Sequence, residues 1–190
     1  MHHVIYVPGV GDSNVRWQQR AISTWKVWGV QPHMVPMVWA HDEPPQQKID
    51  RLLSQIDDCA TTGSVSLVGA SAGAAAVLVA FAQRPAVVRS VVCIAGKINH
   101  AQTIGEAYRL RNPALLPIAA MVPSALQQLA DRHDDILSIR ALYDPIVPAK
   151  DSIVAGARNR AALSVGHAVT IAMQLLFGAP RFVRFGILKP

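Results

Sequence analysis

Apolar residues form six short runs along the chain, separated by segments with a helical pattern. The runs occupy residues 3–7, 32–39, 64–68, 90–95, 136–143 and 161–165. Helices are expected near 14–28, 45–60, 72–84, 149–157 and 168–177. Repeated strand-helix order predicts a parallel sheet with helices on both faces. The runs are rich in Val, Ile and Leu, as strands buried on both sides are. We therefore predict an α/β fold.

The predicted topology also indicates where a ligand binds. Right-handed crossovers bring the carboxyl ends of parallel strands to one edge of the sheet, and open α/β sheets bind their ligands there. Residues that directly follow each strand are thus the candidates for chemistry. One connection, between 90–95 and 136–143, has about 40 residues and exceeds what a crossover needs. No repeat, linker or low-complexity tract interrupts the chain, so residues 1–190 are expected to form one domain.

The sequence Gly69-Ala70-Ser71-Ala72-Gly73 follows one of these strands and precedes an alanine-rich helical segment. It fits G-x-S-x-G, in which a tight strand-to-helix turn exposes the serine Oγ above the sheet. Such a turn requires strained backbone angles and small neighbours, and all four neighbours here are Gly or Ala. A close-packed turn in which Ser71 only caps the helix is the structural alternative. We favour Ser71 as a catalytic nucleophile.

A serine nucleophile needs a base, and the base needs an orienting acid. On this type of fold the chain order is Ser, then Asp or Glu, then His. Asp144 ends the run ILSIRALYD, and His167 follows the last apolar run in AALSVGHAV. Both are expected at the same edge as Ser71. The other six histidines precede Asp144, so their order is wrong for the base, whereas Asp151 stays the alternative for the acid.

Acyl transfer also needs N–H donors that stabilise the oxyanion. The N–H of Ala72, directly after the nucleophile, is one expected donor. The loop VPGVGDSNVRW after the first strand should provide the other, since its glycines allow close approach of the backbone. We favour Val10, with Gly11 as the alternative. A plain turn in which Asp12 or Ser13 caps the next helix is compatible with that role.

Together these stretches resemble the α/β-hydrolase superfamily, in particular its small capless serine hydrolases. The matching segments are VIYVPGVGDS, VSLVGASAGAAA, IRALYDPIVP and SVGHAV, which span almost the whole chain. The resemblance implies a six-stranded parallel sheet of order 2-1-3-4-5-6, without the family's N-terminal antiparallel pair. It also assigns nucleophile, acid and base to Ser71, Asp144 and His167. Three residues depart from the common pattern and leave the subfamily open: Pro8, Ala70 and Tyr143.

The resemblance further implies a lid-like insertion over about residues 97–132. Its stretch NPALLPIAAMVPSAL would line an apolar pocket for an acyl chain, although an ordinary amphipathic crossover is the alternative. The residues expected to contact substrate are Gly9, Gly11, Leu115, Leu116 and Met121. We predict a hydrolase for carboxylic esters of short or medium acyl chain. Amide, peptide or thioester cleavage by the same triad, acyl transfer, and a non-catalytic binding module remain alternatives.

Composition and charge restrict the classes of partner that we expect the chain to bind. The chain is 51% hydrophobic and 16% charged, and its formal net charge of +6 is scattered rather than clustered, which argues against nucleic acid. Prolines interrupt the longest apolar stretch, and no signal peptide is evident, so we expect a cytoplasmic protein without stable membrane insertion. Cys59 and Cys93 show no metal-ligand spacing, and no metal or organic cofactor is expected. The partner is a small-molecule ester, and the protein should be a monomer or small homo-oligomer.

Overall fold

A six-stranded sheet forms the centre of the protein in the computed structural model, which describes residues 1–13 and 15–186. Its strands are β1 (His2–Val7), β2 (Val30–Met34), β3 (Ser64–Ala70), β4 (Val88–Ile94), β5 (Ile136–Arg140) and β6 (Arg158–Ala161). Their order is β2-β1-β3-β4-β5-β6, and every neighbouring pair is parallel. This confirms the predicted α/β class and strand order.

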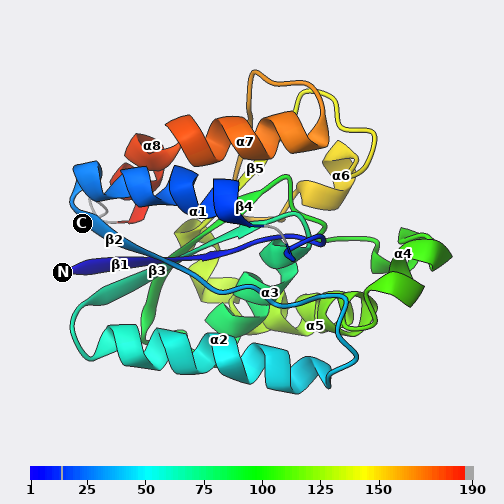
Figure 1. Ribbon diagram of the computed structural model, residues 1–190, viewed down its shortest axis with the longest axis horizontal. Helices are drawn as coiled ribbons and strands as arrows, with labels where there is room; N and C mark the ends of the chain where they lie inside the picture. The colour runs from blue at the N-terminus through cyan, green and yellow to red at the C-terminus, as the bar shows by residue number, and fades with distance from the viewer. Residues whose placement is uncertain (14, 187–190) are drawn as a thin grey trace.

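Helices cover both faces of the sheet, as Figure 1 shows. One layer contains α1 (Arg16–Ser23), the 3-10 helix η1 (Thr24–Trp28), α7 (His167–Phe177) and α8 (Ala179–Gly186). The other contains α2 (Pro45–Ala60), α3 (Ala72–Gln83) and α5 (Leu115–Gln128). The short helices α4 (Glu106–Arg111) and α6 (Ala149–Ser152) lie on the side to which the strands' carboxyl ends point (Figure 1). Two further 3-10 helices are η2 (Ala101–Thr103) and η3 (Ala130–Asp135).

Alternating side chains of each strand enter two separate cores. In β1, Ile5 and Val7 pack under α2 and α3, whereas Val4 and Tyr6 pack under the opposite helical layer. This alternation follows from the two-residue period of a strand. Between its ends α3 is buried on all sides, with a run of ten buried residues from Ala72 to Phe81. Its alanines allow the helix to lie close to β3. The turn that connects β3 to α3 therefore has little conformational freedom.

Strand β6 differs from the expected run at 161–165. The structure places it at Arg158–Ala161, whose four residues are all exposed, at the edge of the sheet. An edge strand has a neighbour on one side only, and charged residues there hinder pairing with other chains. Apolar periodicity therefore gave no indication of it. The expected apolar run instead leads into α7, and Val165 forms an isolated bridge with Tyr143.

The segment expected as a lid, 97–132, contains η2, α4 and α5. Helix α5 buries one side in the same core as α3, with buried residues Leu115, Ile118, Ala119, Val122 and Ala125. The helix tolerates Pro117 because that residue lies in its first turn, where a backbone N–H has no helical partner. No helix among residues 1–13 and 15–186 combines the length and the apolar character that crossing a membrane requires. Helix α8 packs Phe182 and Phe185 into the second core.

Candidate active site

Ser71 occupies the turn between β3 and α3 with φ 52° and ψ −119°, a conformation that non-glycine residues rarely adopt. The two glycines of the motif make this turn possible. A Cβ on Gly69 would lie 2.4 Å from the carbonyl oxygen of Gly73, and one on Gly73 would lie 2.2 Å from that of Val7. Any side chain at either position would therefore push β1, β3 or α3 apart.

Backbone hydrogen bonds hold the strained turn in place. The N–H of Ser71 donates to Ile94 at 2.9 Å, and the carbonyl of Ser71 accepts from Lys97 at 3.2 Å. Although Ser71 stands at the N-cap position of α3, its hydroxyl makes no capping hydrogen bond. The structural alternative of a simple helix cap therefore has no hydrogen bond in its favour, and Ser71 Oγ is left available for chemistry.

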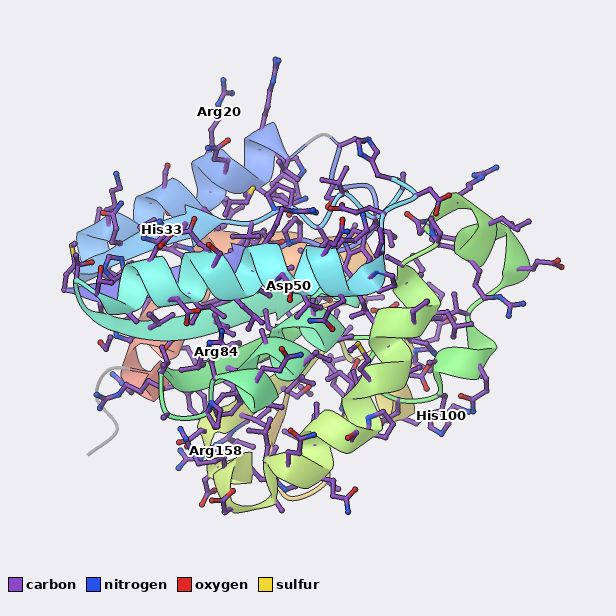
Figure 2. All side chains as sticks on the ribbon, turned by 90° about the horizontal axis from the view of Figure 1, so that it is seen from below. Arg20, His33, Asp50, Arg84, His100 and Arg158 are labelled. Atoms are coloured by element: carbon purple, nitrogen blue, oxygen red, sulfur yellow. The ribbon has the colours of Figure 1, made fainter. Side chains whose placement is uncertain are left out.

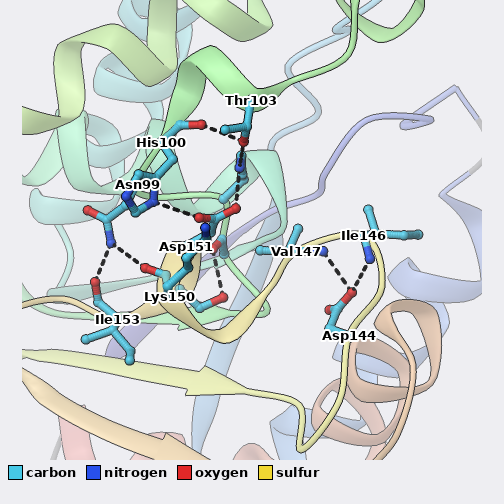
Figure 3. A network of polar contacts seen from close by, with 12 residues as sticks. Asn99, His100, Thr103, Asp144, Ile146, Val147, Lys150, Asp151 and Ile153 are labelled. Atoms are coloured by element: carbon cyan, nitrogen blue, oxygen red, sulfur yellow. Dashed lines mark hydrogen bonds and ion pairs between the residues drawn. The ribbon is translucent and has the colours of Figure 1, made fainter.

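Asp144 and His167 come together beside this turn. Asp144 follows β5, His167 is the first residue of α7, and the distance from His167 Nδ1 to Asp144 Oδ2 is 2.7 Å. The other carboxylate oxygen of Asp144 accepts the N–H groups of Ile146 and Val147 at 2.8 and 2.9 Å (Figure 3). An ionised carboxylate can only accept, so Nδ1 of His167 carries the proton and Nε2 keeps its lone pair.

The two loops that carry acid and base are joined to each other. Gly166 donates its N–H to the carbonyl of Tyr143 at 2.8 Å, one residue before the acid and one before the base. Gly166 has φ 93°, a conformation that glycine adopts without steric cost. Thr170 donates both its N–H and its hydroxyl to the Gly166 carbonyl, at 3.0 and 2.8 Å. The histidine is thus positioned by the backbone as well as by Asp144.

Ser71 and His167 line one cavity of about 700 Å³. It opens beyond the carboxyl ends of the strands. Its apolar walls come from β1, the first loop, α5, α7 and the loop after β5, with residues Val10, Leu115, Ile146, Val147 and Ile171. Tyr108 and Thr103 reach it from α4 and η2. Tyr6 also lines it and donates its hydroxyl to Gln18 at 2.6 Å, while burial raises the pKa of Tyr6, so this wall stays uncharged.

The loop after β1 lies directly against the nucleophile. A Cβ on Gly9 would lie 2.8 Å from Ser71 Cβ and 3.4 Å from Ser71 Oγ. The next residue, Val10, lines the cavity, as does Ala72 on the other side of the serine. Neither the N–H of Val10 nor that of Ala72 donates to any residue that the structure describes. Among the described residues, these two N–H groups thus have no acceptor, and both residues line the cavity that Ser71 lines.

Known structures with the same architecture share this arrangement of elements. Est1E from Butyrivibrio proteoclasticus aligns with a TM-score of 0.73 at 14% identity over 99% of this chain and 88% of its own. The chain has the α/β-hydrolase fold. An extracellular alpha/beta-hydrolase from a Paenibacillus species aligns with a TM-score of 0.70 at 12% identity, over 98% of this chain and 100% of its own. A structure from the archaeon Nitrososphaera gargenis, reported with carboxylesterase activity profiles, gives 0.68 at 14% identity, over 96% and 90%. The sequence matches no protein-family model and no curated protein.

Within this α/β-hydrolase fold, the first loop has anchors that sequence reasoning did not identify. The carboxylate of Asp12 accepts the N–H groups of Val38 and Trp39, at 2.6 and 3.3 Å, instead of capping α1. The indole of Trp39 donates to the carbonyl of Pro8 at 3.2 Å. Because Pro8 and Asp12 bracket Gly9 and Val10, these contacts fix the loop that faces Ser71. Both anchored residues lie within the short segment PGVGD. Their partners, however, follow β2 and are distant in the sequence.

A second polar cluster, set apart from Asp144 in Figure 3, lines the same cavity through Lys97, Thr103 and Asp151. Asp151, whose side chain is 2% exposed, forms an ion pair with Lys97, and its other carboxylate oxygen lies 2.8 Å from His100 Nδ1. Lys97 also donates to Thr103 at 2.7 Å. This cluster ties the start of α6 to the segment after β4, the same segment that holds the Ser71 carbonyl. Asp151, the alternative acid, thus contacts His100 rather than His167.

The residues expected to contact substrate lie in different places. Gly9 and Leu115 line the cavity with Ser71. Leu116 lines a separate cavity of about 450 Å³, which residues 98–102 also line. Met121 packs against the core under α5, and Gly11, with φ 84°, lies in the turn of the first loop. The helical period explains this division, since consecutive residues of α5 face different directions.

Gly9 offers a test of this geometry. Gly9→Ala should lower kcat/KM for an ester substrate by about 10²-fold, because the added methyl group displaces the nucleophile or closes the space beside it. Gly105→Ala is a matched control, since Gly105 lines the same cavity but a Cβ there would meet nothing within 4 Å. Steady-state kinetics on both variants measure this difference in kcat/KM. Equal activity of the two variants would contradict the close approach of Gly9 to Ser71.

Proposed function

We propose that this chain is a serine hydrolase that cleaves carboxylic esters through an acyl-enzyme intermediate on Ser71. One observation carries the proposal: a serine in a strained strand-to-helix turn shares a cavity with a histidine whose Nδ1 is held by a buried carboxylate. This is the constellation that acyl transfer requires. Structures of similar fold include Est1E, also solved with ferulic acid bound, and the carboxylesterase-linked structure named above.

In the proposed first step, His167 Nε2 takes the proton of Ser71 Oγ as that oxygen attacks the ester carbonyl carbon. The developing oxyanion accepts hydrogen bonds from the N–H groups of Val10 and Ala72. Asp144 stabilises the imidazolium that forms. His167 then gives the proton to the leaving alcohol as the carbon–oxygen bond breaks, and Ser71 carries the acyl group.

In the second step, a water molecule replaces the alcohol. His167 removes its proton as the water oxygen attacks the acyl carbonyl, and the same two donors hold the second oxyanion. Ser71 then leaves with the proton returned by His167, which releases the carboxylic acid. Every proton transfer runs through His167, and the chain's own residues supply each group that these two steps use.

The cavity favours a short or medium acyl chain. Aliphatic side chains such as Val10, Ile146 and Val147 line the cavity, and each buried CH₂ of an alkyl chain contributes about 0.8 kcal/mol of binding. The part of the 97–132 segment that covers this space is η2, α4 and the start of α5, through Thr103, Ile104, Tyr108 and Leu115. We propose that this smaller part, within one hydrolase domain, is what encloses the acyl chain.

A substrate panel tests the proposed class. p-Nitrophenyl esters from acetate to dodecanoate, matched anilides and matched thioesters should be compared at equal concentration. We expect esters to be turned over faster than anilides, with a maximum among the shorter chains. A fluorophosphonate probe should label the wild-type protein. Absence of both labelling and turnover would leave a non-catalytic binding module on the hydrolase scaffold, and faster anilide turnover would favour an amidase.

The pH dependence of the reaction follows from the role of His167. Only a neutral imidazole accepts the Ser71 proton, so general-base catalysis requires kcat/KM to fall toward acid pH. Titrimetric ester hydrolysis from about pH 5 to 8 measures this directly. The fall should be reversible on return to neutral pH, which separates it from unfolding. A rate that stays constant over this range would be inconsistent with His167 as the base.

A further inference from the structure

A second group of reactive side chains lies at the other end of β1 from the cavity. His3 in β1, His33 in β2 and Cys59 in the last turn of α2 each offer a ligand atom, and all three atoms lie within 4.8 Å of one another. β1 begins beside this group and ends at the loop that faces Ser71, so the two sites are separate. His33 lies on the edge strand β2, on the side of the molecule that α2 covers (Figure 2).

Hydrogen bonds around His3 fix the direction of its lone pair. Thr62 donates its hydroxyl proton to the carbonyl of Cys59 at 3.3 Å, so its oxygen accepts from His3 Nε2, 3.0 Å away. His3 therefore carries its proton on Nε2 and a lone pair on Nδ1. That Nδ1 faces His33 Nε2 at 2.9 Å. A histidine that is held through one ring nitrogen and presents the other to a neighbouring ligand has the arrangement common in metal sites.

Cys59 is the third ligand, and the three ligands together favour one class of metal ion. Cys59 is buried, which raises the pKa of its thiol, and Gln55 donates to its sulfur at 3.3 Å. Two imidazole nitrogens and one thiolate suit Zn²⁺ and exclude hard ions such as Mg²⁺ and Ca²⁺. Tetrahedral Zn²⁺ needs such ligand atoms roughly 3.3–3.6 Å apart, from bond lengths of about 2.0–2.3 Å. The 2.9 Å between His3 Nδ1 and His33 Nε2 is slightly shorter than this range, and each of the three residues offers a ligand atom within 4.8 Å of the other two, so side-chain rotations can bring the set into it.

We propose that His3, His33 and Cys59 bind one Zn²⁺ ion, with water as the fourth ligand. Half-buried His33 leaves a route for the ion and the water from solvent. Without the ion, His33 Nε2–H donates to the lone pair of His3 Nδ1. Binding releases the thiol proton of Cys59 to solvent and moves the His33 proton from Nε2 to Nδ1, so that His33 Nε2 and His3 Nδ1 both donate lone pairs to the ion. The ion then joins β1, β2 and α2. Sequence patterns do not indicate this site, because its ligands come from three elements with no short motif between them.

Metal content and stability test the site without any activity measurement. Untagged protein should be stripped with a chelator, dialysed, and titrated with ZnCl₂ or, in parallel, MgCl₂. We expect one equivalent of tightly bound Zn²⁺ by elemental analysis and a rise of the thermal unfolding midpoint of roughly 5–10 °C at saturation, because only the folded state assembles the ligands. MgCl₂ should produce no rise. Co²⁺ in place of Zn²⁺ should show a thiolate-to-metal charge-transfer band.

Variants assign the ligands. His33→Gln and Cys59→Ser should lose the stoichiometric ion and the stabilisation, and Cys59→Ser should also lose the cobalt band. His41→Ala, which removes an exposed histidine outside the group, should bind as the wild type does. The metal-free unfolding midpoints of the variants show whether each one folds. Weak binding that all variants share equally, or a cobalt spectrum without the charge-transfer band, would overturn the proposal and leave the proposed hydrolase function untouched.

Discussion

Ser71→Ala should reduce ester turnover by about 10⁵- to 10⁶-fold, the loss that follows removal of a triad serine. The alcohol oxygen that forms the acyl-enzyme is absent from this variant, so only the oxyanion donors and the cavity remain to accelerate the reaction. Initial rates with a p-nitrophenyl ester, together with fluorophosphonate labelling, measure the loss. Labelling should disappear completely, because the probe reacts with the same oxygen.

The fold of the Ser71→Ala variant should be intact. The hydroxyl makes no capping hydrogen bond with α3, and the backbone bonds of residue 71 do not involve the side chain. Because alanine tolerates the positive φ of this turn no better than serine, the thermal midpoint should change little. Ser54→Ala, on the exposed side of α2, provides a serine control that keeps full activity. A Ser71→Ala variant that retained turnover would place the nucleophile elsewhere.

The sequence predicted the core of the fold because buried parallel strands have a simple composition. Five of the six strands lie within a few residues of the apolar runs, and their order follows from right-handed crossovers. β6 was not predicted, because Arg158–Ala161 is an edge strand and does not require apolar residues. The position of the turn at Ser71 was equally predictable, since its four small neighbours leave few other roles for that segment.

Contacts between distant loops could not be predicted from the sequence. Asp12 and Trp39, which lie 27 residues apart in the chain, fix the loop beside Ser71, and nothing in their local sequence indicates that pairing. The Lys97 and Asp151 ion pair is similar, because 54 residues separate its partners. Asp151 was considered as the acid on chain order alone. The distinction between it and Asp144 depends on which histidine each carboxylate reaches, and only the three-dimensional structure contains that information.

The two carboxylates permit a sharp comparison, because each contacts a histidine through Nδ1. Asp144→Asn should lower kcat by about 10⁴-fold while the protein stays folded. The amide oxygen still accepts the N–H groups of Ile146 and Val147, which turns the amide nitrogen toward His167. Because that nitrogen only donates, His167 must present an unprotonated Nδ1 and carry its proton on Nε2. Nε2 then has no lone pair for the proton of Ser71.

Asp151→Asn should have the opposite effects. It leaves the Asp144 and His167 pair unchanged. We therefore expect kcat to fall by less than about tenfold, which is less than the loss of general acid–base catalysis would cause. It removes the charge that offsets the nearly buried ammonium of Lys97, and breaking such a pair costs about 3–5 kcal/mol of stability. Thermal unfolding and kcat measured on both variants separate the two roles. A loss of kcat in Asp151→Asn that equals the loss in Asp144→Asn, at matched folded fraction, would transfer the acid's role to the second cluster.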